Sequence, residues 1–64
     1  TLVVKSVDLP KKIEIFTLDS RCAKSILTNK FENSIDIEDL PSACYFIKVH
    51  LTTAEVWVGK FIKM

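Results

Sequence analysis

The sequence has very little glycine, few cysteines and no excess of charge of either sign. One glycine among 64 residues leaves no glycine-rich loop to hold a phosphate group. Nine basic residues against eight acidic ones argue against nucleic-acid binding and against a polybasic membrane patch, because both need a basic excess. No apolar run approaches the roughly 20 residues needed to cross a bilayer.

Cys22 and Cys44 are the only cysteines, and His50 is the only histidine. Two thiols and one imidazole are too few ligands for a structural zinc site, so we expect neither a metal nor another cofactor. The cysteines are interpreted as two buried thiols that act as small hydrophobic side chains. A disulfide between them stays open, because the sequence does not give the distance between their Cα atoms.

What the sequence does have is short apolar runs separated by turn residues, in a chain that is 48% hydrophobic. A chain of this length forms one domain, and such runs are typical of an all-β sandwich. We therefore predict a small antiparallel β-sandwich of about six short strands as a single domain over residues 1–64. Strands are expected at residues 1–6, 12–17, 34–37, 44–51 and 56–63, the last two forming an antiparallel hairpin.

Residues 21–31 fit two structures almost equally well. Cys22, Ala23, Ile26, Leu27 and Phe31 recur at helical spacing, and a serine just before them could cap a helix. A strand over roughly residues 22–28 is the alternative. Periodicity alone does not decide between them.

Alternation in the final hairpin assigns side chains to faces. Tyr45 and every second residue to Leu51 share one face, whereas Phe46 lies on the other. We place Trp57 and Phe61 with Phe46 on the outer face, where they pack against other segments or form an exposed patch for a partner. Leu40 is expected to plug the core, and Tyr45, just after a Leu-Pro turn, predicts a tyrosine corner with a hydroxyl–backbone hydrogen bond.

Few side chains could support catalysis. His50 has no serine or cysteine nucleophile beside it in the pattern, so we interpret it as a surface residue. Asp36, Glu38 and Asp39 form a small acidic cluster, which a solvated sheet surface explains better than paired catalytic carboxylates or a cation site. The sequence therefore predicts a protein that is not an enzyme.

The second half of the chain resembles a known family. Its ordered motifs, an Ile-Asp-Leu strand, a Leu-Pro-x-Gly-x-Tyr turn, a Phe-Val-Lys-Val strand and a terminal Lys-Phe-Ile-Lys, are similar to those of the C-terminal sorting domain of the type IX secretion system. In this chain they correspond to residues 35–37, 40–45, 46–49 and 60–63. Upstream, residues 13–21 (IEIFTLDSR) resemble the family's Val-x-Ile-Tyr-Asp-Leu-x-Gly-Arg, so that the similarity covers roughly residues 12–64.

The resemblance implies an Ig-like β-sandwich with a strand at about residues 22–27. It also implies a C-terminal piece of a larger exported protein, which passes through the periplasm to the cell surface. The outer-membrane export machinery would recognise the last strand, with Lys60, Phe61, Ile62 and Lys63 as the partner-binding residues. Phe61 is expected to act as an apolar anchor and the two lysines to set the charge around it.

The chain departs from the family at three places. Ser20 and Ala43 stand where the family has glycine, so we expect these turns to differ, because glycine at such turns usually supplies a positive φ. The family's upstream Tyr-Pro-Asn-Pro segment is absent. The alternative function is therefore an Ig-like structural or protein-interaction module without sorting activity. Since a short sandwich has open sheet edges, we also expect a strand-mediated homodimer, formed by exchange of the strand at residues 1–6.

Overall fold

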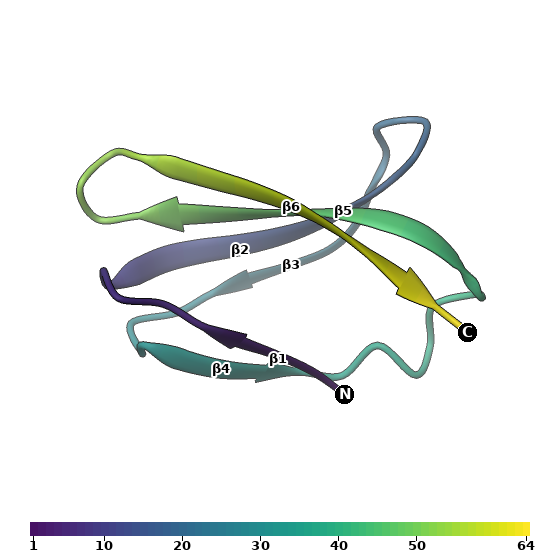
Figure 1. Cartoon of the computed structure of the whole chain (residues 1–64), viewed down its shortest axis with the longest axis horizontal. Coiled ribbons are helices and arrows are strands. Elements are labelled where there is room, and N and C mark those ends of the chain that lie inside the picture. The colour runs from purple at the N-terminus through teal and green to yellow at the C-terminus, as the bar shows by residue number, and fades with distance from the viewer.

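The computed structural model describes residues 1–64 as six β-strands without a helix, which confirms the all-β prediction (Figure 1). No helix long and apolar enough to cross a membrane is present. The strands are β1 (Leu2–Lys5), β2 (Pro10–Thr17), β3 (Cys22–Leu27), β4 (Glu32–Ile35), β5 (Ala43–Leu51) and β6 (Val56–Lys63).

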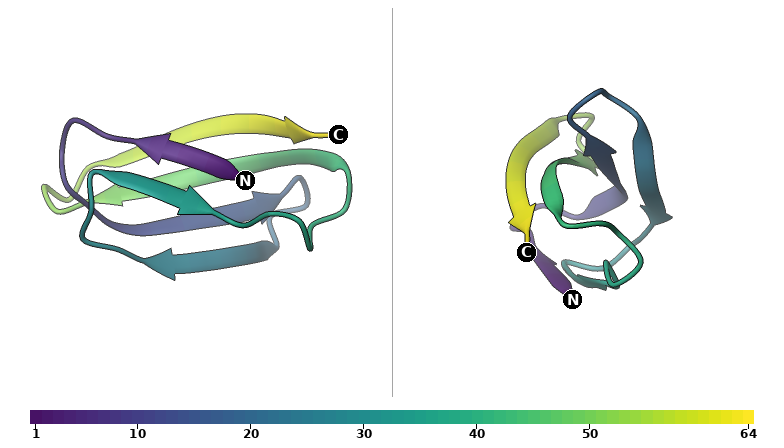
Figure 2. Two further views of the ribbon diagram at one scale, coloured as in Figure 1. Left: turned by 90° about the horizontal axis from the view of Figure 1, so that it is seen from below. Right: turned by 90° about the vertical axis from the view of Figure 1, so that its right-hand side faces the viewer.

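The strands form two antiparallel sheets that pack as a sandwich (Figure 2). One sheet has four strands in the order β3-β2-β5-β6, and the other has only β1 and β4. The small sheet covers the inner face of the large one. As a result, β1 and β6 lie at one side of the sandwich, and β3 and β4 lie at the other.

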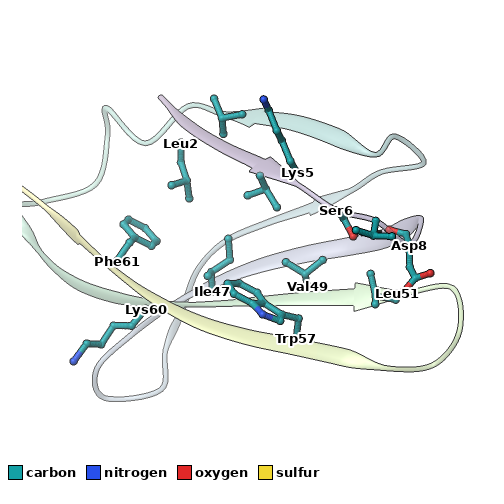
Figure 3. A pocket seen from close by; sticks show the side chains of 13 residues that line it. Leu2, Lys5, Ser6, Asp8, Ile47, Val49, Leu51, Trp57, Lys60 and Phe61 are labelled. Atoms are coloured by element: carbon teal, nitrogen blue, oxygen red, sulfur yellow. Dashed lines mark hydrogen bonds between the residues drawn. The ribbon is translucent and has the colours of Figure 1, made fainter.

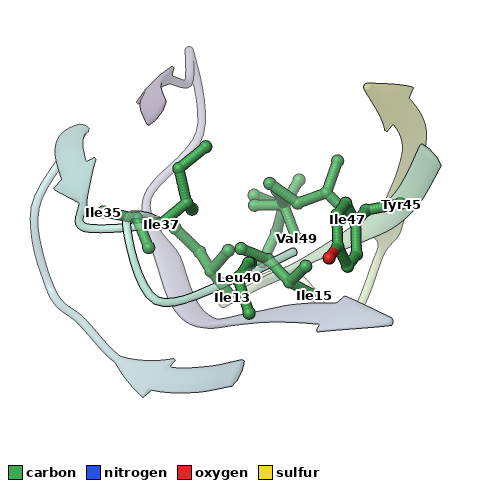
Figure 4. Close-up of a cluster of buried hydrophobic side chains, with 9 residues drawn as sticks. Ile13, Ile15, Ile35, Ile37, Leu40, Tyr45, Ile47 and Val49 are labelled. Carbon is green, nitrogen blue, oxygen red and sulfur yellow. The ribbon is translucent and has the colours of Figure 1, made fainter. Parts of the chain in front are cut away.

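The core lies between the sheets and follows the period-2 alternation of the strands (Figure 4). Tyr45 begins a run of inward side chains on β5, as predicted, and Leu40 is buried in the loop before it. Together with Ile13 and Ile15 of β2 they form most of a nine-residue cluster. Its members are Ile13, Ile15, Ile35, Ile37, Leu40, Tyr45, Ile47, Val49 and Leu51.

The segment after Ser20 is a strand, as the family resemblance implies, and the helical alternative is wrong. Ile26 pairs with Ile13, so β3 hydrogen-bonds along the edge of β2. Its apolar side chains do not form the single buried stripe that a helix would need. Leu27 is 83% exposed and Phe31 is 54% exposed.

Two hairpins share one turn geometry. In the β2–β3 turn, the Ser20 N–H donates to the Thr17 carbonyl at 3.0 Å, and in the β5–β6 turn, the Ala54 N–H donates to the Leu51 carbonyl at 3.1 Å. Ser20 has φ 70° and Ala54 has φ 73°. This is a three-residue hairpin in which a left-handed residue follows the turn, a position that normally favours glycine. Ser20 thus has a positive φ at the position where the family that the sequence resembles has glycine, whereas Ala43 does not have a positive φ.

The face assignment of Trp57 and Phe61 is wrong. Trp57 pairs with Val49 and Phe61 pairs with Tyr45, so both aromatic side chains point to the core side of the sheet. Residues directly opposite each other in an antiparallel pair share a face. Because β6 is apolar on both faces, alternation alone could not tell which face is inner. The register fixed by the turn at Ala54 decides it.

The cysteines also differ from the prediction of two buried thiols. Both are free, with Cys22 exposed and Cys44 only partly buried. Cys22 lies on β3 and Cys44 on β5, and β2 runs between these strands. Two strand spacings are about 9.6 Å, beyond the roughly 7 Å that a disulfide can bridge. The sheet order therefore excludes a disulfide within one chain.

Candidate interaction surface

The predicted partner-binding residues lie on β6, the edge strand of the large sheet. Alternation divides them between two faces. Phe61 and Lys63 are opposite Tyr45 and Ala43 and point to the inner side, whereas Lys60 and Ile62 lie on the outer face. The four residues therefore do not form one contiguous patch around Phe61.

Phe61 and Lys63 hold β6 in place. The Phe61 ring stacks on Tyr45 with centroids 5.5 Å apart, and it packs against the core. The Lys63 ammonium donates to the Leu40 carbonyl at 2.5 Å and to the Glu38 carbonyl at 3.3 Å. These contacts tie the end of the chain to the loop between β4 and β5.

Lys60 and Ile62 are accessible to a partner instead. Lys60 is exposed and forms no ion pair, and Ile62 is 66% exposed. Val56 and Val58 lie on the same outer face and are also exposed. We call these four residues the β6 stripe: Val56, Val58, Lys60 and Ile62.

A shallow aromatic hollow adjoins the β6 stripe. It has a volume of about 200 Å³, and Val58 belongs to both features. Phe16 and Phe46 face each other across β2 and β5, and the Lys48 ammonium lies 5.1 Å from the centre of the Phe16 ring. The outer face of the large sheet therefore offers apolar and cationic groups side by side.

A larger cavity of about 450 Å³ opens at the side of the sandwich between β1 and β6 (Figure 3). We call this opening the β1–β6 seam. Ile47 and Val49 form its floor, and Trp57 and Phe61 reach into it from β6. Nine of its thirteen lining residues are hydrophobic, and three of them, Ile47, Val49 and Leu51, belong to the buried core cluster. Sequence reasoning missed the seam, and apolar residues on both faces of β6 were its only signal.

The polar side chains form structural pairs. Glu14 on β2 accepts a hydrogen bond from Nε2 of His50 on β5 at 2.5 Å. This bond, aided by the charge of Lys12 and opposed by partial burial, holds the pKa of the Glu14 carboxyl below its ordinary value of 4.5. This hydrogen bond thus links His50 on β5 to Glu14 on the neighbouring strand β2.

The acidic cluster is also engaged within the chain. Asp39 accepts a hydrogen bond from the Lys24 ammonium at 2.8 Å, and this bond lowers the pKa of the Asp39 carboxyl below 3.8. Asp36 accepts from the Glu38 N–H at 3.0 Å. No group of three or more His, Cys, Asp or Glu side chains is arranged to hold a metal ion.

Comparison with protein-family models, curated proteins and solved structures finds no match for this chain.

Proposed function

We propose that this domain is a non-catalytic C-terminal sorting domain, recognised by the outer-membrane export machinery through β6. The protein that carries it would pass through the periplasm to the cell surface or the extracellular space. Two features support the proposal: the ordered motifs that resemble the type IX sorting domain, and the position of β6 as an exposed edge strand.

The anchored but accessible state of β6 is the observation that carries this proposal. A recognition strand must be held in one conformation and must also expose side chains that a receptor can contact. Phe61 and Lys63 hold the strand in one conformation, because the Phe61 ring stacks on Tyr45 and the Lys63 ammonium donates to the Leu40 carbonyl. The β6 stripe supplies the exposed side chains, because none of them has a hydrogen-bond partner within the chain.

The direct test is export of a fluorescent passenger fused to residues 1–64, in a host that has the type IX apparatus. Passenger at the cell surface supports sorting. Passenger retained in the periplasm, with the domain shown to be folded, contradicts it and leaves a structural or interaction module.

The structure sharpens this test at the level of residues. Deleting residues 60–63 would also remove Phe61 and Lys63 and so disturb the fold. The double variant Lys60→Glu/Ile62→Ser leaves the anchoring residues Phe61 and Lys63 in place and should reduce export without unfolding the domain. A matched control is Lys11→Glu/Leu27→Ser, which makes the same changes at exposed sites away from β6. Equal export of both variants would contradict recognition through β6.

The second candidate is an Ig-like structural or interaction module appended to an extracellular protein. The aromatic hollow and the β6 stripe favour it, because contiguous exposed apolar groups mark protein-binding surfaces. Such a module would bind a neighbouring domain and would not carry a passenger across the outer membrane.

Homodimerisation remains a prediction of either function. In this structure β1 pairs with β4 of the same chain, over only four residue pairs. Exchange of β1 between two chains would keep the same pairing and would form a dimer at high concentration. A single monomeric species in sedimentation analysis across the accessible concentration range would contradict it.

A further inference from the structure

The two sides of the sandwich are closed differently. At the β3–β4 side, the Lys24 ammonium donates to the Asp36 carbonyl at 2.5 Å, and Thr28 is hydrogen-bonded to Asn33. At the β1–β6 seam, no hydrogen bond or ion pair joins the two strands. No Cα atom of β1 lies within 8 Å of a Cα atom of β6, and the same holds for β3 and β4, so the two sides differ in their hydrogen bonds and not in this spacing. The seam is therefore an open slot between two strand edges.

Both walls of the slot are unpaired backbone. β1 pairs only with β4, and β6 pairs only with β5, so each strand has a free edge toward the seam. Neighbouring strands in a sheet are about 4.8 Å apart, and one inserted strand would need edges about 9.6 Å apart. No Cα pair of β1 and β6 is as close as 8 Å, so the two edges do not pair with each other and a gap separates them.

The floor and the rim of the seam set the chemistry of such a strand. Val49 and Trp57 line its inner side, so side chains that point inward must be apolar. Lys60 stands at the rim on β6 without an ion-pair partner. Lys5 on the opposite rim is only loosely paired, with its Nζ atom 3.9 Å from Glu32. Asp8 is the one carboxylate among the lining residues, so the two lysines leave the seam with a net charge of +1, which an outward carboxylate on the inserted strand would complement.

We propose that the β1–β6 seam binds an extended segment of a partner protein, which inserts as a strand with apolar residues inward and acidic residues outward. Adding a strand to an exposed sheet edge is a common mode of peptide recognition. An aliphatic ligand fits the apolar floor less well, because it would cover the free N–H and C=O groups of both edges without pairing them. This inference does not depend on export.

The test uses the whole chain and a synthetic peptide of about six residues, in which valine and aspartate alternate. Trp57 is the only tryptophan, so its fluorescence reports directly on the seam. Binding should shift the emission to shorter wavelength and should protect backbone amides of β1 and β6, but not those of β3, from hydrogen exchange. A peptide methylated at its backbone nitrogens should bind at least about tenfold more weakly, since it cannot pair with both edges.

Charge is tested separately. Lys60→Glu should weaken binding of the aspartate peptide up to about fivefold, whereas Lys30→Glu, an equal charge change at an exposed site outside the seam, should leave it unchanged. Equal binding of the methylated peptide would show an apolar site without strand pairing and would overturn the proposal. The proposal would also be overturned if the protein alone forms a dimer that protects the same amides and that does not dissociate when peptide is added. A second copy of the chain would then occupy the seam.

Discussion

The indole of Trp57 lies over Gly59, two residues further along the same face of β6. A Cβ atom at position 59 would overlap the Cη2 atom of the ring and would lie 2.7 Å from Cζ3. The single glycine of the chain is therefore not a turn residue, and its φ is not positive. It makes room for an aromatic ring that lines the β1–β6 seam.

Substitution Gly59→Ala should move the Trp57 ring and leave the backbone of β6 in place. Trp57 is 55% exposed, so its ring can swing outward at low cost. We expect a red shift of Trp57 emission and a change in the free energy of unfolding below about 1 kcal/mol, because alanine also suits a strand interior better than glycine. An unchanged emission spectrum would mean that the ring does not rest on Gly59 in solution.

Replacing the left-handed turn residues by glycine should stabilise the fold. Ser20→Gly and Ala54→Gly each remove the strain of a side chain at positive φ, and we expect each to raise the free energy of unfolding by up to about 1 kcal/mol. Chemical denaturation measures it. The control Thr53→Gly, in the same turn but at negative φ, should destabilise, since it only adds freedom to the unfolded chain. Destabilisation by all three variants would contradict the turn geometry.

The hydrogen bond predicted for the tyrosine corner is present, and its contribution to the free energy of unfolding can be measured. The Tyr45 hydroxyl donates to the Pro41 carbonyl at 2.5 Å, and the side chain is 2% exposed. Tyr45→Phe keeps the stacking with Phe61 and removes only this hydrogen bond. We expect the free energy of unfolding to fall by about 1–2 kcal/mol, measured by urea denaturation. Stability equal to that of the parent protein would show that the bond contributes nothing net.

Stability should depend on pH through Glu14. Because the bond with His50 lowers the pKa of Glu14 in the folded state, the contribution of this carboxylate is fully present above its ordinary value of 4.5. It is lost as the pH falls through the lower folded value. The melting temperature should therefore drop below about pH 4.5, and less steeply in Glu14→Gln. Glu55→Gln, at an exposed glutamate without an ion pair, is the control and should follow the parent curve.

The candidate site was only partly predictable. Lys60 and Ile62 lie on the outer face of β6, but Phe61 and Lys63 hold the strand from its inner side. The motif at residues 60–63 shows which strand carries these side chains. It does not show that Phe61 and Lys63 anchor the strand while the other two residues are exposed, because that difference depends on how β6 pairs with β5.

The sequence by itself determined the fold class, five of the six strands and most of the core, because alternating apolar residues such as Ile13 and Ile15 can be buried only on one face of a sheet. It also determined the tyrosine corner, whose residues are close along the chain. Tertiary structure alone decided the inner position of Trp57, the separation of Cys22 from Cys44 and the open seam. Each depends on strand order and register between segments far apart in the chain, and local periodicity contains no information about either.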